Sequence, residues 1–292
     1  MRDHHRLHKV AHACADLGES PVWDERNDLL YFVDISAGRI NALTRQGRLE
    51  TLYQSRARIG ALALTDRSNL IFTEDASVAL LDVGSGLVCK HSAAVHDGAS
   101  YRFNDGACDP QGRFVTGLMD EGPSRNTGAL YRYDCKLDAQ VIYRDMALPN
   151  GLAWSEDGHT LFFVDSVARS IFRASYSAEG TLGAVTLFAE TPAELGRPDG
   201  IALDQAGGVW VCQFNGGCLL RYDSSGRMSD RIVMPVPRPT SCCFGGEDLG
   251  TLYVTTARFA MTPSELAEYP DAGDLYAIRP EIAGIQRHPF KE

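Results

Sequence analysis

Several features that define other protein classes are missing from this 292-residue chain. No apolar run approaches the roughly 18 residues of a bilayer-spanning helix, so we expect no membrane partner. No apolar stretch follows the polar residues 1–6, which argues against a secretory signal. Basic residues are too few for a nucleic-acid surface, since 28 Lys and Arg face 38 Asp and Glu, a net charge of −10. We therefore expect neither a nucleic-acid nor a membrane partner.

The chain contains cysteine, but not in a pattern that indicates disulfide bonds or a zinc site. The eight cysteines form no Cys-x-x-Cys pair, and their spacing matches no zinc or disulfide pattern. Several fall on strand-like phrases, where a free thiol acts as a small buried hydrophobe, and we extend that interpretation to each of them. Reduced thiols also fit a cytoplasmic protein.

What the chain does contain is a repeated phrase. Its clearest copy, residues 149–165, reads as an entry residue, a short apolar strand, a turn and a second apolar strand. A third strand-like phrase closes most units. When the copies are aligned on Asn150, they recur at intervals of 41 to 49 residues, anchored at Glu19, Gly60, Asn104, Asn150, Asp199 and Thr240. A period in the forties that carries several short strands predicts a propeller rather than a helical solenoid.

The predicted fold class is therefore all-β, a six-bladed β-propeller with four-stranded blades. We expect a disordered tail at residues 1–7 and a single propeller domain over residues 8–292. A strand at residues 10–17 should pair with the last blade and close the ring, which removes an exposed sheet edge. One short helical insertion is expected near the C-terminus, where Thr262, Pro263 and Glu265 form a capping box.

The anchors precede the first strand of each unit, so they should meet as a ring at one mouth of the central channel. Glu19, Asn150 and Asp199 supply hard oxygen donors, which favour Ca²⁺, Mg²⁺ or Mn²⁺ over metals that prefer soft ligands. Three protein ligands leave coordination positions for water and a substrate oxygen. We expect one divalent cation there, with Zn²⁺ kept as a further candidate. Gly60 has no side chain, which we interpret as room for a ligand.

A second set of polar residues is expected to contact the substrate. Arg102 and Asn104 alternate across Phe103, so both side chains can point the same way and donate to hydroxyl or carbonyl oxygens. The loop at residues 121–128 either overhangs the channel mouth as a lid, with Glu121 touching substrate, or is a plain solvated loop.

Five phrases together resemble the SMP-30/gluconolactonase/luciferin-regenerating-enzyme-like family. They lie at residues 17–23, 102–106, 148–153, 198–202 and 237–242, and the likeness runs from about residue 14 to the end. The resemblance implies a six-bladed propeller with one divalent metal bound by Glu19, Asn150 and Asp199. It also implies sugar contacts from Arg102 and Asn104, and a further acidic contact near Glu121.

The reaction that the resemblance implies is hydrolysis of a sugar lactone to its aldonic acid. We also expect the protein to be a monomer or weak homo-oligomer. The metal would polarise the lactone carbonyl, and Asp199 would double as ligand and general base. Two alternatives stay open: a propeller that hydrolyses phosphotriesters, and a non-catalytic calcium-binding or scaffold propeller.

Overall fold

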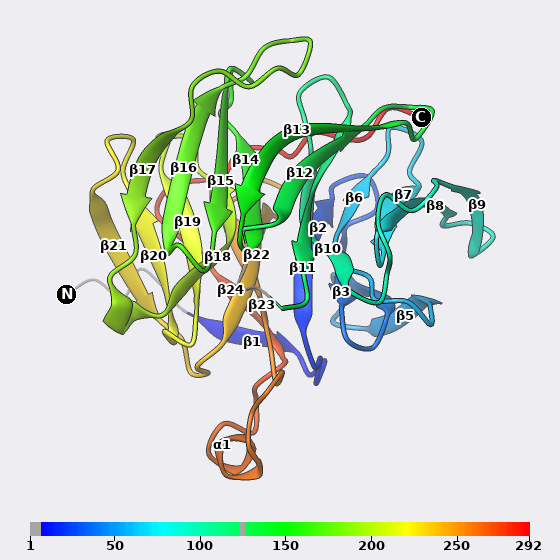
Figure 1. The fold of residues 1–292 in the computed structure, drawn as a ribbon. Helices are drawn as coiled ribbons and strands as arrows, with labels where there is room; N and C mark the ends of the chain where they lie inside the picture. The colour runs from blue at the N-terminus through cyan, green and yellow to red at the C-terminus, as the bar shows by residue number, and fades with distance from the viewer. Residues whose placement is uncertain (1–6, 123–125) are drawn as a thin grey trace.

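The computed structural model describes residues 7–122 and 126–292 of the chain. Of the expected tail at residues 1–7, only Leu7 is described, and it packs against the hydrophobic core of blades five and six. The predicted all-β, six-bladed propeller is confirmed: six four-stranded antiparallel sheets stand in a ring (Figure 1).

Blades one to three follow the chain without a crossover. Blade one contains β2 (Gly18–Asp24), β3 (Leu29–Asp34), β4 (Arg39–Thr44) and β5 (Leu49–Gln54). Blade two contains β6 (Leu62–Leu64), β7 (Leu70–Glu74), β8 (Ser77–Asp82) and β9 (Leu87–His91). Blade three contains β10 (Tyr101–Cys108), β11 (Phe114–Asp120), β12 (Gly128–Tyr133) and β13 (Ala139–Met146).

Blades four and five repeat this plan, and blade six closes the ring. Blade four contains β14 (Pro149–Trp154), β15 (Thr160–Asp165), β16 (Ser170–Ser175) and β17 (Thr186–Glu190). Blade five contains β18 (Arg197–Leu203), β19 (Val209–Phe214), β20 (Cys218–Tyr222) and β21 (Met228–Val233). Blade six contains β22 (Pro239–Gly245), β23 (Thr251–Thr256), β24 (Leu275–Ile278) and, from the opposite end of the chain, β1 (His8–Ala11).

The closing strand was predicted in the right place but with the wrong bounds. β1 pairs antiparallel with β24, yet it ends at Ala11 rather than continuing to residue 17. The backbone turns away at Cys14, which has a positive φ of 48° and donates its N–H to the carboxylate of Asp274. Leu17 then rejoins blade six through a single bridge to Ala257.

Helical structure is minor. α1 (Pro263–Glu268) has the predicted capping box, in which Thr262 Oγ1 accepts from the Glu265 N–H and the Glu265 side chain accepts from the Thr262 N–H. A single 3-10 turn, η1 (Ala193–Leu195), precedes blade five. Across the described residues, none of the helices has the length and apolarity to traverse a bilayer.

The core lies between neighbouring blades, where inner-strand side chains interdigitate. Trp154 and Phe163 are buried as expected. The cysteine prediction was wrong for three of the eight: Cys14, Cys89 and Cys135 are exposed. Cys89 lies on the outer strand β9, Cys135 in the turn after β12 and Cys14 in the linker after β1, all positions that face away from the core.

The C-terminal tail crosses one end of the channel. Thr65, Cys108 and Asp204, from three different blades, each form an isolated bridge with the tail. Arg287 donates from Nη2 to the carbonyls of Ile201 and Cys242 at 3.2 and 3.0 Å. The tail therefore covers the end of the channel opposite α1 (Figure 1).

Candidate metal and substrate site

The six anchors meet as a ring, because each inner-strand entry contacts the next. Asn104 Nδ2 donates to Pro149 O at 3.0 Å, and Thr240 Oγ1 closes the circle by donating to Gly18 O at 2.5 Å. The other junctions are Ser20 Oγ to Leu62 O at 3.3 Å, Gly60 against the backbone of Phe103, Ser166 Oγ to Pro198 O at 2.6 Å, and Gly200 against Ser241. Residues far apart in the chain are therefore neighbours at one mouth of the channel.

A local irregularity in the pairing lies beside five of the six anchors, all except Gly60. The register between the two innermost strands shifts next to Glu19, Asn104, Asn150, Asp199 and Thr240. Such bulges re-aim a side chain that regular pleating would send to a sheet face, and they occur often beside active sites. The bulges explain how strands that pack on both faces still present polar side chains to the channel.

Three carboxylates share this mouth, one more than the sequence predicted. Glu19, Asp105 and Asp199 are 4%, 5% and 6% exposed. Burial, followed by the charges of Asp199 and Asp105, raises the pKa of Glu19 well above its usual value. Burial and then the charge of Asp105 do the same to the pKa of Asp199. The charges of these buried carboxylates therefore act unfavourably on one another, and a bound cation would relieve that repulsion.

Asp105 was missed because it stands between Asn104 and Gly106 in a phrase typical of a turn, which concealed a third buried acid. Burial is the largest cause that raises the pKa of Asp105, and the positive charge of Arg287 on the C-terminal tail opposes it. The tail residue Arg287 is therefore close enough to Asp105 for its charge to act on that carboxyl.

The amide of Asn150 is oriented as a metal ligand would be. Its Nδ2 donates to Ser166 Oγ at 3.1 Å, and Ser166 Oγ donates in turn to Pro198 O. Asn150 Oδ1 and Asp199 Oδ1 are both buried without a hydrogen-bond partner among the described residues. Orphaned oxygens beside three buried carboxylates form a donor set that fits one hard divalent cation.

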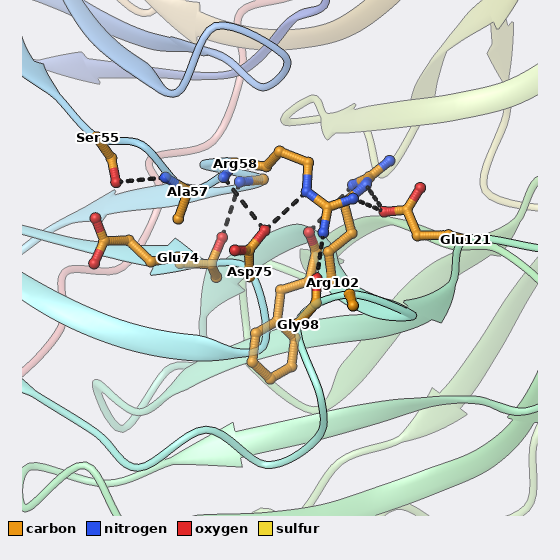
Figure 2. A network of polar contacts seen from close by, with 12 residues as sticks. Ser55, Ala57, Arg58, Glu74, Asp75, Gly98, Arg102 and Glu121 are labelled. Atoms are coloured by element: carbon orange, nitrogen blue, oxygen red, sulfur yellow. Dashed lines mark hydrogen bonds and ion pairs between the residues drawn. The ribbon is translucent and has the colours of Figure 1, made fainter.

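Arg102, Asn104 and Glu121 form one network beside this donor set. Arg102 Nη1 donates to Asn104 Oδ1 at 2.6 Å, and Arg102 Nε pairs with Glu121 Oε1 at 3.1 Å. Arg58, which the sequence analysis did not single out, also pairs with Glu121 (Figure 2) and is held by Asp75 at 2.8 Å. Burial lowers the pKa of Arg102, while the charge of Glu121 opposes that shift.

The interpretation of Gly60 was wrong. A Cβ at this position would lie 2.2 Å from Phe103 O and 2.8 Å from Asn104 O. The missing side chain therefore admits the backbone of blade three, not a ligand. The lid proposed for residues 121–128 includes residues 123–125, which lie outside the described part of the chain.

A further cation was also missed at the mouth. Arg197 stands two residues before Asp199, and its positive charge is the largest influence that lowers the pKa of Asp199 against the effect of burial. Its guanidinium lies 5.5 Å from the ring centre of Phe214, which Arg238 approaches at 5.6 Å. Arg238 pairs with Asn215 and Glu265, whereas the guanidinium of Arg197 has no ion pair or hydrogen bond within the described residues.

Comparisons with known proteins identify relatives over nearly the full chain. The family model for the SMP-30/Gluconolactonase/LRE-like region matches residues 17–258. A 6-deoxy-6-sulfogluconolactonase of Pseudomonas putida is 38% identical over 280 residues, covering 94% of each chain. An L-arabinolactonase of Azospirillum brasilense is 34% identical, covering 94% of this chain and 92% of the relative. The crystal structure of a calcium-binding regucalcin from Agrobacterium tumefaciens superposes with a TM-score of 0.91 at 25% identity, covering 97% and 96%.

Proposed function

This chain belongs to the SMP-30/gluconolactonase/LRE-like family, and we propose that it is a hydrolase that opens a sugar lactone to the aldonic acid with the help of one divalent cation. Two relatives above 30% identity carry the names of sugar lactonases. The observation that carries the proposal is the channel mouth itself, where buried carboxylates and orphaned amide and carboxylate oxygens converge.

Glu19, Asn150 and Asp199 are the residues that we assign to the cation. Each comes from the inner strand of a different blade, and each is nearly buried. Ca²⁺, Mg²⁺ and Mn²⁺ suit such all-oxygen donors. A relative described as calcium-binding favours Ca²⁺ among them. When bound, the cation supplies Lewis acidity to the lactone carbonyl.

Asp199 is the residue that we assign to proton transfer. Its carboxylate takes a proton from the attacking water as the water oxygen bonds to the lactone carbonyl carbon. The bond from that carbon to the ring oxygen then breaks, and the proton passes to the ring oxygen, which becomes the free hydroxyl of the aldonic acid. Because Asp199 is buried, bulk water is kept from hydrogen-bonding to the carboxylate oxygen that takes the proton.

Arg102 and Asn104 are assigned to the sugar hydroxyls. Arg102 uses Nε and Nη1 on Glu121 and Asn104, so Nη2 remains to donate to a substrate oxygen. Asn104 is fixed at both ends of its amide, by Arg102 and by Pro149 O. Glu121 positions Arg102 through their ion pair, and its carboxylate is also assigned to accept a hydrogen bond from a substrate hydroxyl.

Arg197 favours a substrate that carries an acidic group besides the lactone. Its guanidinium is held over Phe214 near Asp199, with no carboxylate paired to it within the described residues. A sulfonate, phosphate or carboxylate would supply the missing partner through charge-assisted hydrogen bonds. The 6-deoxy-6-sulfogluconolactonase relative is named for a substrate of this charge type.

One assay tests the proposal and its alternatives. Purified protein is offered neutral aldonolactones, a sulfonated or phosphorylated aldonolactone and one organophosphate, with and without chelator, and acid release is followed above the spontaneous rate. Chelator-sensitive release from a lactone is the expected result. Release of acid from the organophosphate alone would support the phosphotriesterase alternative. No release from any substrate would support the remaining alternative, a non-catalytic calcium-binding propeller.

We also propose a cytoplasmic location, a monomer or weak homo-oligomer, and one structural domain over residues 8–292. Eight free thiols fit a reducing compartment. The single ring of blades, closed by β1, supports one domain.

A further inference from the structure

A second cluster of metal-binding groups lies outside the channel, where the two ends of the chain meet. His12, Cys14 and Asp274 place their ligand atoms within 4.8 Å of one another. Cys14 Sγ lies 3.1 Å from His12 Nε2, and His12 Nδ1 lies 2.9 Å from Asp274 Oδ2. His12 and Cys14 follow β1, whereas Asp274 immediately precedes β24.

We propose that this cluster, the closure site, binds one Zn²⁺ ion through the Cys14 thiolate, the His12 imidazole and the Asp274 carboxylate. Thiolate and imidazole ligands select Zn²⁺ over the hard cations expected in the channel. Zinc bonds of about 2.0–2.3 Å imply distances of about 3.3–3.6 Å between ligand atoms in a tetrahedron. Through the single nitrogen Nδ1, His12 lies 2.9 Å from Asp274 Oδ2 and 3.9 Å from Cys14 Sγ, one separation shorter and one longer than that range. Rotation of the exposed His12 and Cys14 side chains would therefore place the three ligands around one ion, and the fourth position is left for water.

The surroundings hold the ligands ready. Asp274 has no exposed surface, and its Oδ1 accepts from the Cys14 N–H at 3.1 Å, which ties the thiol-bearing backbone to the carboxylate. His12 and Cys14 are exposed, so an ion reaches them from solvent without opening the fold. Lys9 lies 3.3 Å from Asp274 Oδ2 and competes for it, but Lys9 keeps a second partner, Asp271, at 2.8 Å.

The consequence of binding is structural. His12 and Asp274 are 262 positions apart in sequence, so an ion between them would tie β1 to β24. This pairing joins the two ends of the chain in blade six and closes the ring. Cross-links that close long loops restrict the unfolded chain most, and binding to the folded state adds stability by mass action.

Cobalt spectroscopy tests the closure site independently of the channel. Chelator-treated protein is titrated with Co²⁺, and the near-ultraviolet charge-transfer band of a cobalt–thiolate bond is followed. An all-oxygen site cannot produce that band. We expect the band in the wild-type protein and in Cys135→Ser, which removes another exposed thiol, and we expect its loss in Cys14→Ser and His12→Asn.

Thermal unfolding supplies the second readout. Zn²⁺ at about 100 times its Kd should raise the Tm of the wild-type protein by about 5 °C more than that of Cys14→Ser. Lactone hydrolysis by Cys14→Ser should remain at the wild-type level. A wild-type protein without the thiolate band, a band that survives Cys14→Ser, or equal Zn²⁺ shifts in both proteins would overturn the proposal.

Discussion

At the scale of single residues, the account depends on which atoms of the channel mouth are left without protein partners. Asn150 illustrates the point: its Nδ2 donates to Ser166 Oγ, whereas its buried Oδ1 has no partner among the described residues. Asp199 presents an orphaned oxygen of the same kind. A buried oxygen without a partner costs free energy unless a ligand supplies one, so these atoms support the cation site that we propose.

Asp199→Asn should reduce turnover by about 100- to 10,000-fold, the range expected when a general base is lost. The amide keeps the shape of the carboxylate but takes no proton from water. The measurement is kcat for lactone hydrolysis, with the Tm of the same preparation as the control for folding. A variant that folds and keeps near-normal kcat would remove Asp199 from its assigned role.

Ser166→Ala should weaken binding of the divalent cation by about 10-fold or more, the usual effect of removing a group that orients a ligand. Without Ser166 Oγ, the Asn150 amide is free to rotate and turn its Nδ2 toward the site. Calorimetric titration with Mn²⁺ measures the change, and Ser166→Thr, which keeps the hydroxyl, serves as the matched control. Equal Kd values for the alanine and threonine variants would contradict the orienting role.

At the scale of elements, the important devices are the bulges at the start of the inner strands and the close approach of neighbouring blades. The repeat predicted the strands and the anchors because apolar alternation and turn residues are local signals. It could not predict the bulges, since register depends on pairing with a strand elsewhere in the chain. For the same reason Gly60 was misinterpreted: its neighbour Phe103 O belongs to the next blade.

Gly60→Ala should destabilise the protein by about 1–3 kcal/mol, the typical cost of overpacking, because its Cβ would collide with backbone rather than with a flexible side chain. Chemical denaturation measures the free energy of unfolding. Gly47→Ala is the comparison variant for a loop glycine, since a Cβ there meets nothing within 4 Å. Gly47 has a positive φ of 81°, so an alanine there costs backbone strain without crowding. A Gly60→Ala variant as stable as the wild-type protein would contradict the crowding.

At the scale of the whole molecule, six blades bring together residues as far apart in sequence as Gly18 and Thr240, which are separated by 222 positions. The channel is covered at one end by the C-terminal tail. The repeat and the family motifs were enough to predict the propeller, and the motifs are the basis on which we assign Glu19, Asn150 and Asp199 to a cation. Asp105, Arg58 and Arg197 were not found, because each resembles an ordinary turn or surface residue until the ring is closed. The closure site was missed for the same reason, since it joins residue 12 to residue 274.

Ca²⁺ should stabilise the chelator-treated protein. Because the cation offsets the repulsion among Glu19, Asp105 and Asp199, saturation at about 100 times the Kd should add about 2.7 kcal/mol, or roughly 5 °C in Tm. Ca²⁺ prefers oxygen ligands, so the closure site should not contribute. The shift should be much smaller in Asp199→Asn, and an undiminished shift in that variant would place the calcium site elsewhere.

The most direct test of the central claim is the position of the cation in crystals of the protein loaded with Mn²⁺, read from anomalous scattering. The account predicts a peak about 2.0–2.6 Å from oxygens of Glu19, Asn150 and Asp199 together. A map without a peak at the channel mouth, or with a peak that any of these three side chains fails to reach, would contradict it.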